Sequence, residues 1–115
     1  MTASCLFCRI VDGEVPATRA HEDAQTLAFA DIHPQAPTHL IVIPKLHIAR
    51  VADLTAAQEA LMGRLVSVAN RLAESHGLCD SGYRLVVNCG SAGGQTVYHL
   101  HVHLLGGRPM RWPPG

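Results

Sequence analysis

The stretch His99-Leu100-His101-Val102-His103-Leu104-Leu105 decides how this chain folds. Imidazole and aliphatic side chains alternate along it, which predicts a β-strand over residues 97–105 that ends at Gly106-Gly107. Side chains on a strand point alternately to its two faces, so the three histidines share one face and the aliphatic residues share the other. Because three imidazoles buried without partners would be costly, we expect the histidine face to line a cleft.

The three histidines cannot all coordinate one metal ion. With a rise of roughly 3.3 Å per residue, His99 and His103 lie about 13 Å apart on a strand, so the triad must divide its work. An alternative interpretation of alternating histidines is a solvated polar face, or an incidental affinity for metals. A glycine-rich loop that ends in Gln95 and Thr96 lies just before the strand, and it favours a functional site instead.

The aliphatic face of this strand needs a cover, and the clearest helix of the chain, over residues 55–76, can provide it. Asp53 or Thr55 can cap its start, since Thr55-x-x-Gln58 has the spacing of a capping box. Gly77 suits the position after its end. Apolar residues recur along the helix at steps of three and four, as one stripe: Ala57, Leu61, Leu65, Val68 and Leu72.

Shorter elements complete the expected fold. Residues 6–12 can form a short helix that ends at Gly13. The order of strands, long helix and strands lacks the alternation of a parallel doubly wound sheet. The sequence therefore predicts a single domain over residues 1–115, of the α+β class, with an antiparallel five-stranded sheet, one long helix and one short helix. The four other strands are expected over residues 18–22, 25–31, 38–43 and 83–88.

The composition excludes several classes of function. Nine basic and nine acidic side chains cancel, so the chain has no bulk field to gather a nucleic-acid polymer or an anionic membrane. The first residues lack the pattern of a secretory signal, and no apolar run approaches the roughly 20 residues that span a bilayer. We therefore expect a cytoplasmic protein that binds neither nucleic acid nor membrane.

The cleft expected beside the triad carries groups suited to phosphoryl chemistry. A neutral imidazole is a good nucleophile near neutral pH because its pKa is about 6.5. Attack on phosphorus would give a phosphohistidine intermediate and divide one hard displacement into two easier steps. The charge on the transferring group and the leaving group then need fixed donors. The chain offers such donors in His39, His103, Asn88, Gln95, Thr96 and the backbone of the Gly93-Gly94 turn.

These residues carry a resemblance to a known family. The triad stretch resembles the motif His-φ-His-φ-His-φ-φ, where φ is an apolar residue, of the histidine-triad (HIT) superfamily. The ending, from Gly106-Gly107 to Trp112-Pro-Pro-Gly115, resembles the Hint branch, the nucleoside phosphoramidases. The resemblance runs from about residue 5 to residue 115. Further matching segments are Phe29-Ala-Asp31-Ile32, Pro34-Gln-Ala-Pro-Thr-His39, Ile43-Pro44-Lys45-x-His47-Ile48, Val87-Asn88 and Gly93-Gly94-Gln95-Thr96-Val97-Tyr98.

The resemblance implies a catalytic set and an assembly. His101 would be the nucleophile, while His39 and His103 would contact the phosphate and shape the proton relay. Thr96 stands where many relatives have serine, so the hydroxyl is kept. The family fold implies a homodimer whose two sheets join into one. Trp112 would then reach toward the partner's site, and packing on its own domain is the competing interpretation.

The resemblance also implies a purine nucleotide site. Asn88, Gln95 and Thr96 would hold the phosphate oxygens or the leaving group, beside the backbone at Gly94. Asp31 would accept the hydroxyl groups of the ribose. The purine would lie in an apolar slot, although some of its residues could be ordinary core: Leu6, Phe7, Ile10, Phe29, Ile32 and Ile41.

A metal site is the expectation for two of the four cysteines. Cys5-x-x-Cys8, with His47 and His99, makes a Cys₂His₂ set that would close a tetrahedral zinc site. This arrangement is similar to that of many bacterial HIT proteins, and the zinc would be structural; no organic cofactor is expected. Free thiols, or a thioredoxin-like pair, are the alternatives. The absence of a strand before the motif disfavours the pair.

Three functions remain open at this stage. The first is a phosphoramidase acting on adenosine or guanosine 5′-phosphoramidates through a nucleotidyl-histidine intermediate. The second is a dinucleoside polyphosphate hydrolase, which the ending Trp112-Pro-Pro-Gly115 disfavours. The third is a zinc-stabilised nucleotide-binding module with little turnover, which the intact set of His39, His101, His103 and Asn88 disfavours.

Overall fold

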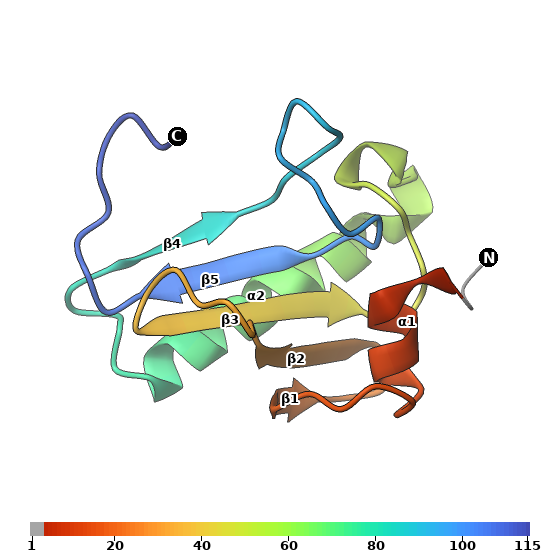
Figure 1. Ribbon diagram of the computed structural model, residues 1–115, viewed down its shortest axis with the longest axis horizontal. Helices are drawn as coiled ribbons and strands as arrows, with labels where there is room; N and C mark the ends of the chain where they lie inside the picture. The colour runs from red at the N-terminus through yellow and green to blue at the C-terminus, as the bar shows by residue number, and fades with distance from the viewer. Residues whose placement is uncertain (1–3) are drawn as a thin grey trace.

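The computed structural model describes residues 4–115, in which five strands form one antiparallel sheet (Figure 1). Along the sheet the strands follow the order β1-β2-β3-β5-β4, so β3 lies at the centre and β1 and β4 form the edges. This arrangement confirms the predicted α+β class and its antiparallel five-stranded sheet. The strands are β1 (Arg19–Glu22), β2 (Thr26–Ala30), β3 (Thr38–Pro44), β4 (Tyr83–Val86) and β5 (Val102–Gly106).

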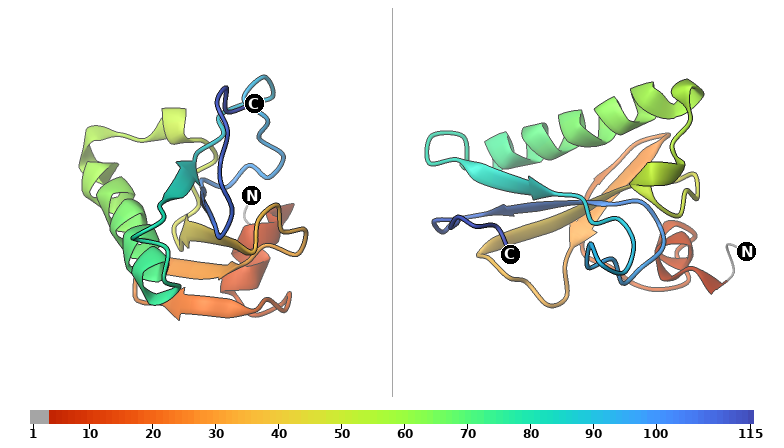
Figure 2. Two further views of the ribbon diagram at one scale, coloured as in Figure 1. Left: turned by 90° about the vertical axis from the view of Figure 1, so that its left-hand side faces the viewer. Right: turned by 90° about the horizontal axis from the view of Figure 1, so that it is seen from above.

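The long helix α2 (Glu59–Ser75) covers one face of the sheet, as the two views of Figure 2 show. Its buried residues Leu65, Val68 and Leu72 belong to a core that includes the aliphatic residues of the triad stretch. Removing each such side chain from water contributes about 1.5–3 kcal/mol. The aliphatic face of the triad stretch is thus anchored on this helix: Leu100, Val102 and Leu104 are each at most 1% exposed.

The long helix begins later than the sequence predicts. Two 3₁₀ turns precede it, η2 (Val51–Asp53) and η3 (Ala56–Gln58). The expected capping box is present, with Thr55 N–H donating to Gln58 Oε1 at 3.0 Å, but it closes the tighter turn η3 instead of the first turn of α2.

The short helix α1 (Leu6–Val11) lies on the opposite face of the sheet (Figures 1 and 2). Its buried residues Phe7 and Ile10 pack against alternate residues of β2 and β3, in a second core. Both faces of the central strand are therefore covered, and its side chains divide between the two cores by the alternation of a strand. The strand residues of this second core are Leu27, Phe29, Ile41 and Ile43.

The last strand is shorter than predicted, since β5 begins at Val102 and not at residue 97. Its pairing with β3 ends at Val42 and Val102. Before that point the backbone leaves the ladder, and the N–H of Leu100 donates to the carbonyl of Ile48 at 2.6 Å, in the connection after β3. The alternation of side chains continues through this irregular segment, which is why the sequence pattern resembles one long strand.

The described residues include no helix that is both long and apolar enough to cross a membrane.

Candidate active site and metal site

A cavity of about 310 Å³ lies on the face of the sheet that carries α1. Its size is in the range of small-molecule sites, about 300–1,000 Å³. Four of its lining residues had no signal in the sequence, because they lie in irregular segments without periodicity: Val15, Pro16, Ala17 and His33. Val97, the first residue of the predicted last strand, also lines the cavity. Twelve are residues singled out from the sequence: Leu6, Phe7, Ile10, Phe29, Asp31, Ile32, Ile41, Asn88, Gly94, Thr96, His101 and His103.

His101 is held in a defined protonation state. Its Nδ1 lies 2.6 Å from the backbone carbonyl oxygen of His99. A carbonyl only accepts, so Nδ1 carries the hydrogen and Nε2 of the neutral ring keeps a free lone pair. Burial lowers the pKa of His101, against the opposing effect of that hydrogen bond, and so favours the neutral ring. The rings of Phe7 and His101 pack edge to face, with centroids 5.1 Å apart.

A chain of hydrogen bonds determines which nitrogen carries the hydrogen in His39 and in His103. The N–H of Gln35 donates to Nδ1 of His39 at 3.0 Å, so the hydrogen of neutral His39 is on Nε2. That Nε2–H donates to Nδ1 of His103 at 2.9 Å, which leaves Nε2–H of His103 as a donor. Burial, with His101 and His39 nearby, lowers the pKa of His103 to about 4. Burial also lowers that of His39, opposed by Asp31.

Asp31 lies beside this chain of rings. Its Oδ1 accepts the backbone N–H of His33 at 2.8 Å, and its Oδ2 is 3.4 Å from Nε2 of His39. The atoms of Asp31, His39 and His103 are close enough together to surround a metal ion. However, the bond from Gln35 keeps the hydrogen of neutral His39 on Nε2, which faces the other two groups, so the hydrogen-bonded network already accounts for their approach.

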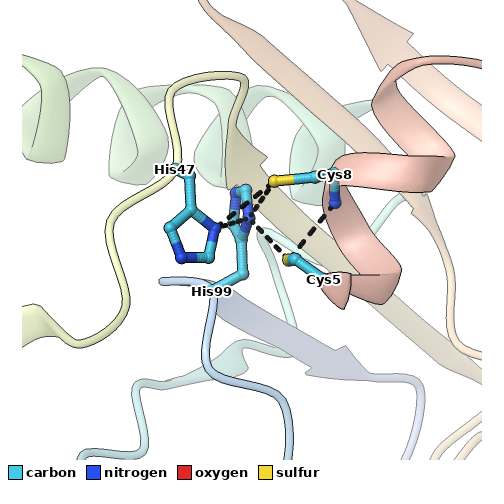
Figure 3. A group of neighbouring side chains, drawn as sticks. All are labelled: Cys5, Cys8, His47 and His99. Atoms are coloured by element: carbon cyan, nitrogen blue, oxygen red, sulfur yellow. Dashed lines mark hydrogen bonds between the residues drawn. The ribbon is translucent and has the colours of Figure 1, made fainter. Parts of the chain in front are cut away.

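The second cluster is the predicted metal set, shown in Figure 3. Nδ1 of His99 is 3.3 Å from Sγ of Cys5, 3.5 Å from Sγ of Cys8 and 3.2 Å from Nδ1 of His47. Bonds of 2.0–2.3 Å in a tetrahedron place ligand atoms roughly 3.3–3.8 Å apart, so these separations are close to those around a zinc ion. His99 Nε2–H donates to the carbonyl of Pro44 at 2.8 Å, which turns the lone pair of Nδ1 into the cluster.

The electrostatics of the cluster also favour a cation. Burial, and the neighbouring Cys5, raise the pKa of Cys8 to about 11. A thiolate is therefore costly here unless a positive ion compensates it. The donor set of two sulfurs and two imidazole nitrogens is the one that structural zinc sites use. Cys79 is exposed and Cys89 is half-buried, and neither belongs to this cluster.

The loop between β4 and the triad closes the cavity on one side. A side chain at Gly93 would approach the carbonyl oxygen of Cys89 to 2.4 Å, and Gly94 has φ of +81°, so both positions require glycine. Nδ2 of Asn88 donates to the carbonyl of Gly93 at 2.7 Å and ties the loop to its own base. The exposed Thr96 lines the cavity.

Three residues that the resemblance selected do not line the cavity. His39 lies behind it, in hydrogen-bond contact with His103. Gln95 is buried, and its side chain bonds to backbone groups. Trp112 is 84% exposed in the tail, where Arg84 donates to the carbonyl of Arg111 and holds the tail near β4.

Fold and site together define the family. The HIT domain family model matches residues 12–110, and the chain belongs to the HIT family. A HIT family hydrolase from Legionella pneumophila has a crystal structure with 55% sequence identity and a TM-score of 0.96; the match covers 97% of this chain and all of that one.

Curated relatives are similarly close over nearly the whole length. An uncharacterized HIT-like protein of Synechococcus elongatus is 50% identical over 115 residues, which is all of both chains. The purine nucleoside phosphoramidase of Escherichia coli is 44% identical over 110 residues, 96% of this chain and 92% of that one.

Proposed function

We propose that this protein is a purine nucleoside phosphoramidase. It hydrolyses the bond between the α-phosphorus and the amine of an AMP or GMP derivative, through a covalent nucleotidyl intermediate on His101. One observation carries the proposal: the hydrogen bond from Nδ1 of His101 to the carbonyl of His99 leaves Nε2 as a free nucleophile at the wall of a nucleotide-sized cavity. The name of the relative from Escherichia coli supports the choice of substrate class.

The cavity suits a purine nucleoside. Phe7, Ile10 and Phe29 offer an apolar wall, and Ile32, which is 83% exposed, can cover the base from the rim. Asp31 has one carboxylate oxygen fixed by the N–H of His33, so its remaining lone pairs can accept ribose hydroxyl groups. Leu6 and Ile41 complete this apolar slot.

The first half-reaction forms a bond from His101 Nε2 to phosphorus while the bond from phosphorus to the amine breaks. The leaving nitrogen takes the bonding electrons and a proton, which the hydroxyl of Thr96 can pass on from water. The His101 ring becomes cationic, and its Nδ1–H bond to His99 stabilises that charge. Nε2–H of His103 and the free N–H of Asn88 are donors for the phosphate oxygens.

The second half-reaction returns the enzyme to its starting state. Water attacks the phosphorus, the bond to Nε2 of His101 breaks, and the ring recovers its lone pair as the water proton is released. The products are a nucleoside monophosphate and an amine, with one water consumed. No step requires a metal at phosphorus.

The cysteine and histidine cluster would hold a structural zinc ion. Cys5, Cys8, His47 and His99 fill all four positions, so the ion would stabilise the fold and would not bind substrate. It would join α1, the connection after β3 and the backbone next to the nucleophile. We propose no organic cofactor.

The protein would act as a cytoplasmic homodimer. Strand β4 is a sheet edge, and the tail that holds the exposed Trp112 lies beside it, so a second copy can extend the sheet and cover the indole. The four free thiols fit a reducing compartment. The chain's balanced charge supports small purine nucleotides, and neither nucleic acid nor membrane, as its ligands.

A comparison of substrates tests the function. Purified protein is given adenosine 5′-phosphoramidate and, in parallel, a diadenosine polyphosphate, and kcat/KM is measured for both. We expect the phosphoramidate to be preferred at least about 100-fold, a difference of about 2.7 kcal/mol in transition-state stabilisation. A preference for the polyphosphate would favour the neighbouring branch of the superfamily. Tight AMP binding without turnover of either compound would favour a binding module.

A further inference from the structure

Gln95 is buried at the base of the glycine-rich loop, and its position has consequences for the loop. Only 6% of its surface is exposed, and it does not line the cavity. Oε1 accepts the N–H of Gly90 at 2.9 Å, while Nε2 donates to the carbonyls of Ala49 at 2.8 Å and Val97 at 3.1 Å. The N–H of Gly90 can only donate, so the oxygen of the amide must face it, and the orientation of the side chain is determined.

Every donor of Gln95 is already used. The two hydrogens on Nε2 go to Ala49 and Val97, and the backbone N–H of Gln95 donates to the carbonyl of Gly90 at 3.0 Å. A phosphate oxygen requires a donor, so Gln95 has none to offer unless it breaks a buried bond. Breaking such a bond would leave a carbonyl without its partner, at a cost of about 1–3 kcal/mol.

Gln95 fixes the backbone on both sides of Thr96. Gln95 is held to Gly90 on one side of Thr96, and the carbonyl of Val97 is held by the same amide on the other side. Thr96 itself makes no hydrogen bond within residues 4–115 and is exposed toward the cavity. The direction of its hydroxyl and its N–H therefore depends on the backbone that Gln95 holds.

The same amide joins the loop to the connection after β3. That connection bonds to residues 95–100 at two points, Ala49 to Gln95 and Ile48 to the N–H of Leu100, and Pro44 at the end of β3 bonds to the ring of His99. The loop is thus fastened to a segment that is itself anchored in the core through Ile48. A rigid loop of this kind can present donors to a transition state without reorganisation.

We propose that Gln95 is a positioning residue, which acts on the reaction by fixing Thr96 and does not itself contact the phosphate. This inference rests on the proposed phosphoramidase function. It assigns the direct contact that the sequence resemblance implied for Gln95 to Thr96, Asn88 and His103. Because a displacement of about 1 Å can reduce a rate by about 100-fold, loosening the loop lowers kcat. The nucleoside part of the cavity, which dominates substrate binding, is left intact.

A double-mutant cycle tests the proposal. The variants are Gln95→Ala, Thr96→Val and the combination, with Ser91→Ala as a matched control in the same loop. We expect Gln95→Ala to lower kcat on adenosine 5′-phosphoramidate by about 10- to 100-fold and to change KM by less than about threefold. In the Thr96→Val background the same change should lower kcat by less than about fivefold, because the group it positions is already gone. Ser91→Ala should keep wild-type rates.

Two results would overturn the proposal. Equal losses in both backgrounds, with a large rise in KM, would mean that Gln95 contacts the phosphate itself. A lower thermal midpoint with unchanged kcat would mean that Gln95 serves stability alone. If Gln95→Ala does not fold, Gln95→Glu, which keeps an acceptor for Gly90 and loses both donors, takes its place in the cycle.

A measurement without substrate separates this inference from the proposed function. Amide hydrogen exchange of residues 90–97 in the unliganded protein should become at least about tenfold faster in Gln95→Ala and stay unchanged in Ser91→Ala. Exchange that does not change would exclude the positioning role even in a protein that hydrolyses the substrate. Absence of turnover by the wild-type protein would reject the phosphoramidase assignment and leave the exchange result standing.

Discussion

His99 and His101 are two residues apart on the same side of the chain, yet the structure prepares them for different chemistry. His99 uses Nε2 to bond the carbonyl of Pro44, so Nδ1 is bare and points at two sulfurs and an imidazole. His101 uses Nδ1 to bond the carbonyl of His99, so Nε2 is bare. The choice of which nitrogen meets a backbone carbonyl thus separates the proposed metal ligand from the proposed nucleophile.

The comparison also shows how the two regions are connected. The carbonyl that orients His101 belongs to His99, a residue whose ring would be fixed by the metal. A change in the proposed metal cluster can therefore reach the proposed nucleophile through a single residue. Each prediction below perturbs one side of this pair.

Removing the proposed nucleophile has the largest expected effect. His101→Ala should lower turnover of adenosine 5′-phosphoramidate by at least about 10⁴-fold, because no other group can form the covalent intermediate. AMP affinity should change by less than about threefold, since the apolar slot remains. Titration calorimetry and steady-state rates check this, with His76→Ala, at the exposed end of α2, as the control. Equal losses of binding and turnover would contradict it.

Removing the proposed metal ligands has the next largest expected effect. Cys5→Ser/Cys8→Ser should lose a bound zinc, about one per wild-type chain, and lower turnover by about 10- to 100-fold through the displaced backbone of His99. Elemental analysis, the thermal midpoint and kcat report the three effects, and the exposed Cys79→Ser is the matched control. A wild-type protein purified without any metal, and as active as a zinc-loaded sample, would refute the link.

The lowered pKa values of His103 and His39 predict that stability depends on pH. This effect is smaller than the effects of the substitutions above. The pKa of His103 is about 4 in the folded protein, and that of His39 is also lowered, against about 6.5 when unfolded. Between these values the unfolded chain binds more protons, so stability is complete above about pH 6.5 and falls as pH decreases toward 4. Thermal unfolding in that window should be less pH-dependent in His103→Gln. An unchanged slope would mean that His103 is not neutral in the folded state.

The conservative change at the cavity has the smallest expected effect. Thr96→Ser keeps the hydroxyl and the backbone N–H, so kcat should change by less than about threefold. A loss in Thr96→Ser as large as that in Thr96→Val would show that the site needs the methyl group as well as the hydroxyl. Parallel kinetics of the two variants decide between them.

Much of this arrangement could be predicted from alternation alone. The aliphatic set of the triad stretch lies in the core under α2, as the period of two requires. The pattern could not reveal that the backbone before Val102 leaves the sheet, because side chains continue to alternate there. It also could not show which nitrogen of each ring is bare, since the deciding carbonyls of Pro44 and His99 are set by the tertiary fold.

Gln95 shows a second limit. Its place beside Thr96 in a glycine-rich loop indicates a phosphate contact, but its side chain turns inward to a carbonyl 46 residues away in the chain. The segment 15–17 lines the cavity without any motif, because it is brought there by the packing of α1 on the sheet. Long-range contacts of this kind leave no local pattern to detect.

Trapping the intermediate tests the central claim most directly. Wild-type protein is mixed with adenosine 5′-phosphoramidate, quenched within the first turnovers at alkaline pH to preserve a phosphorus–nitrogen bond, and mapped by mass spectrometry. We predict a nucleotidyl adduct on His101 that forms and decays as fast as the enzyme turns over. An adduct on another residue, or rapid turnover with no adduct on His101, would contradict the account.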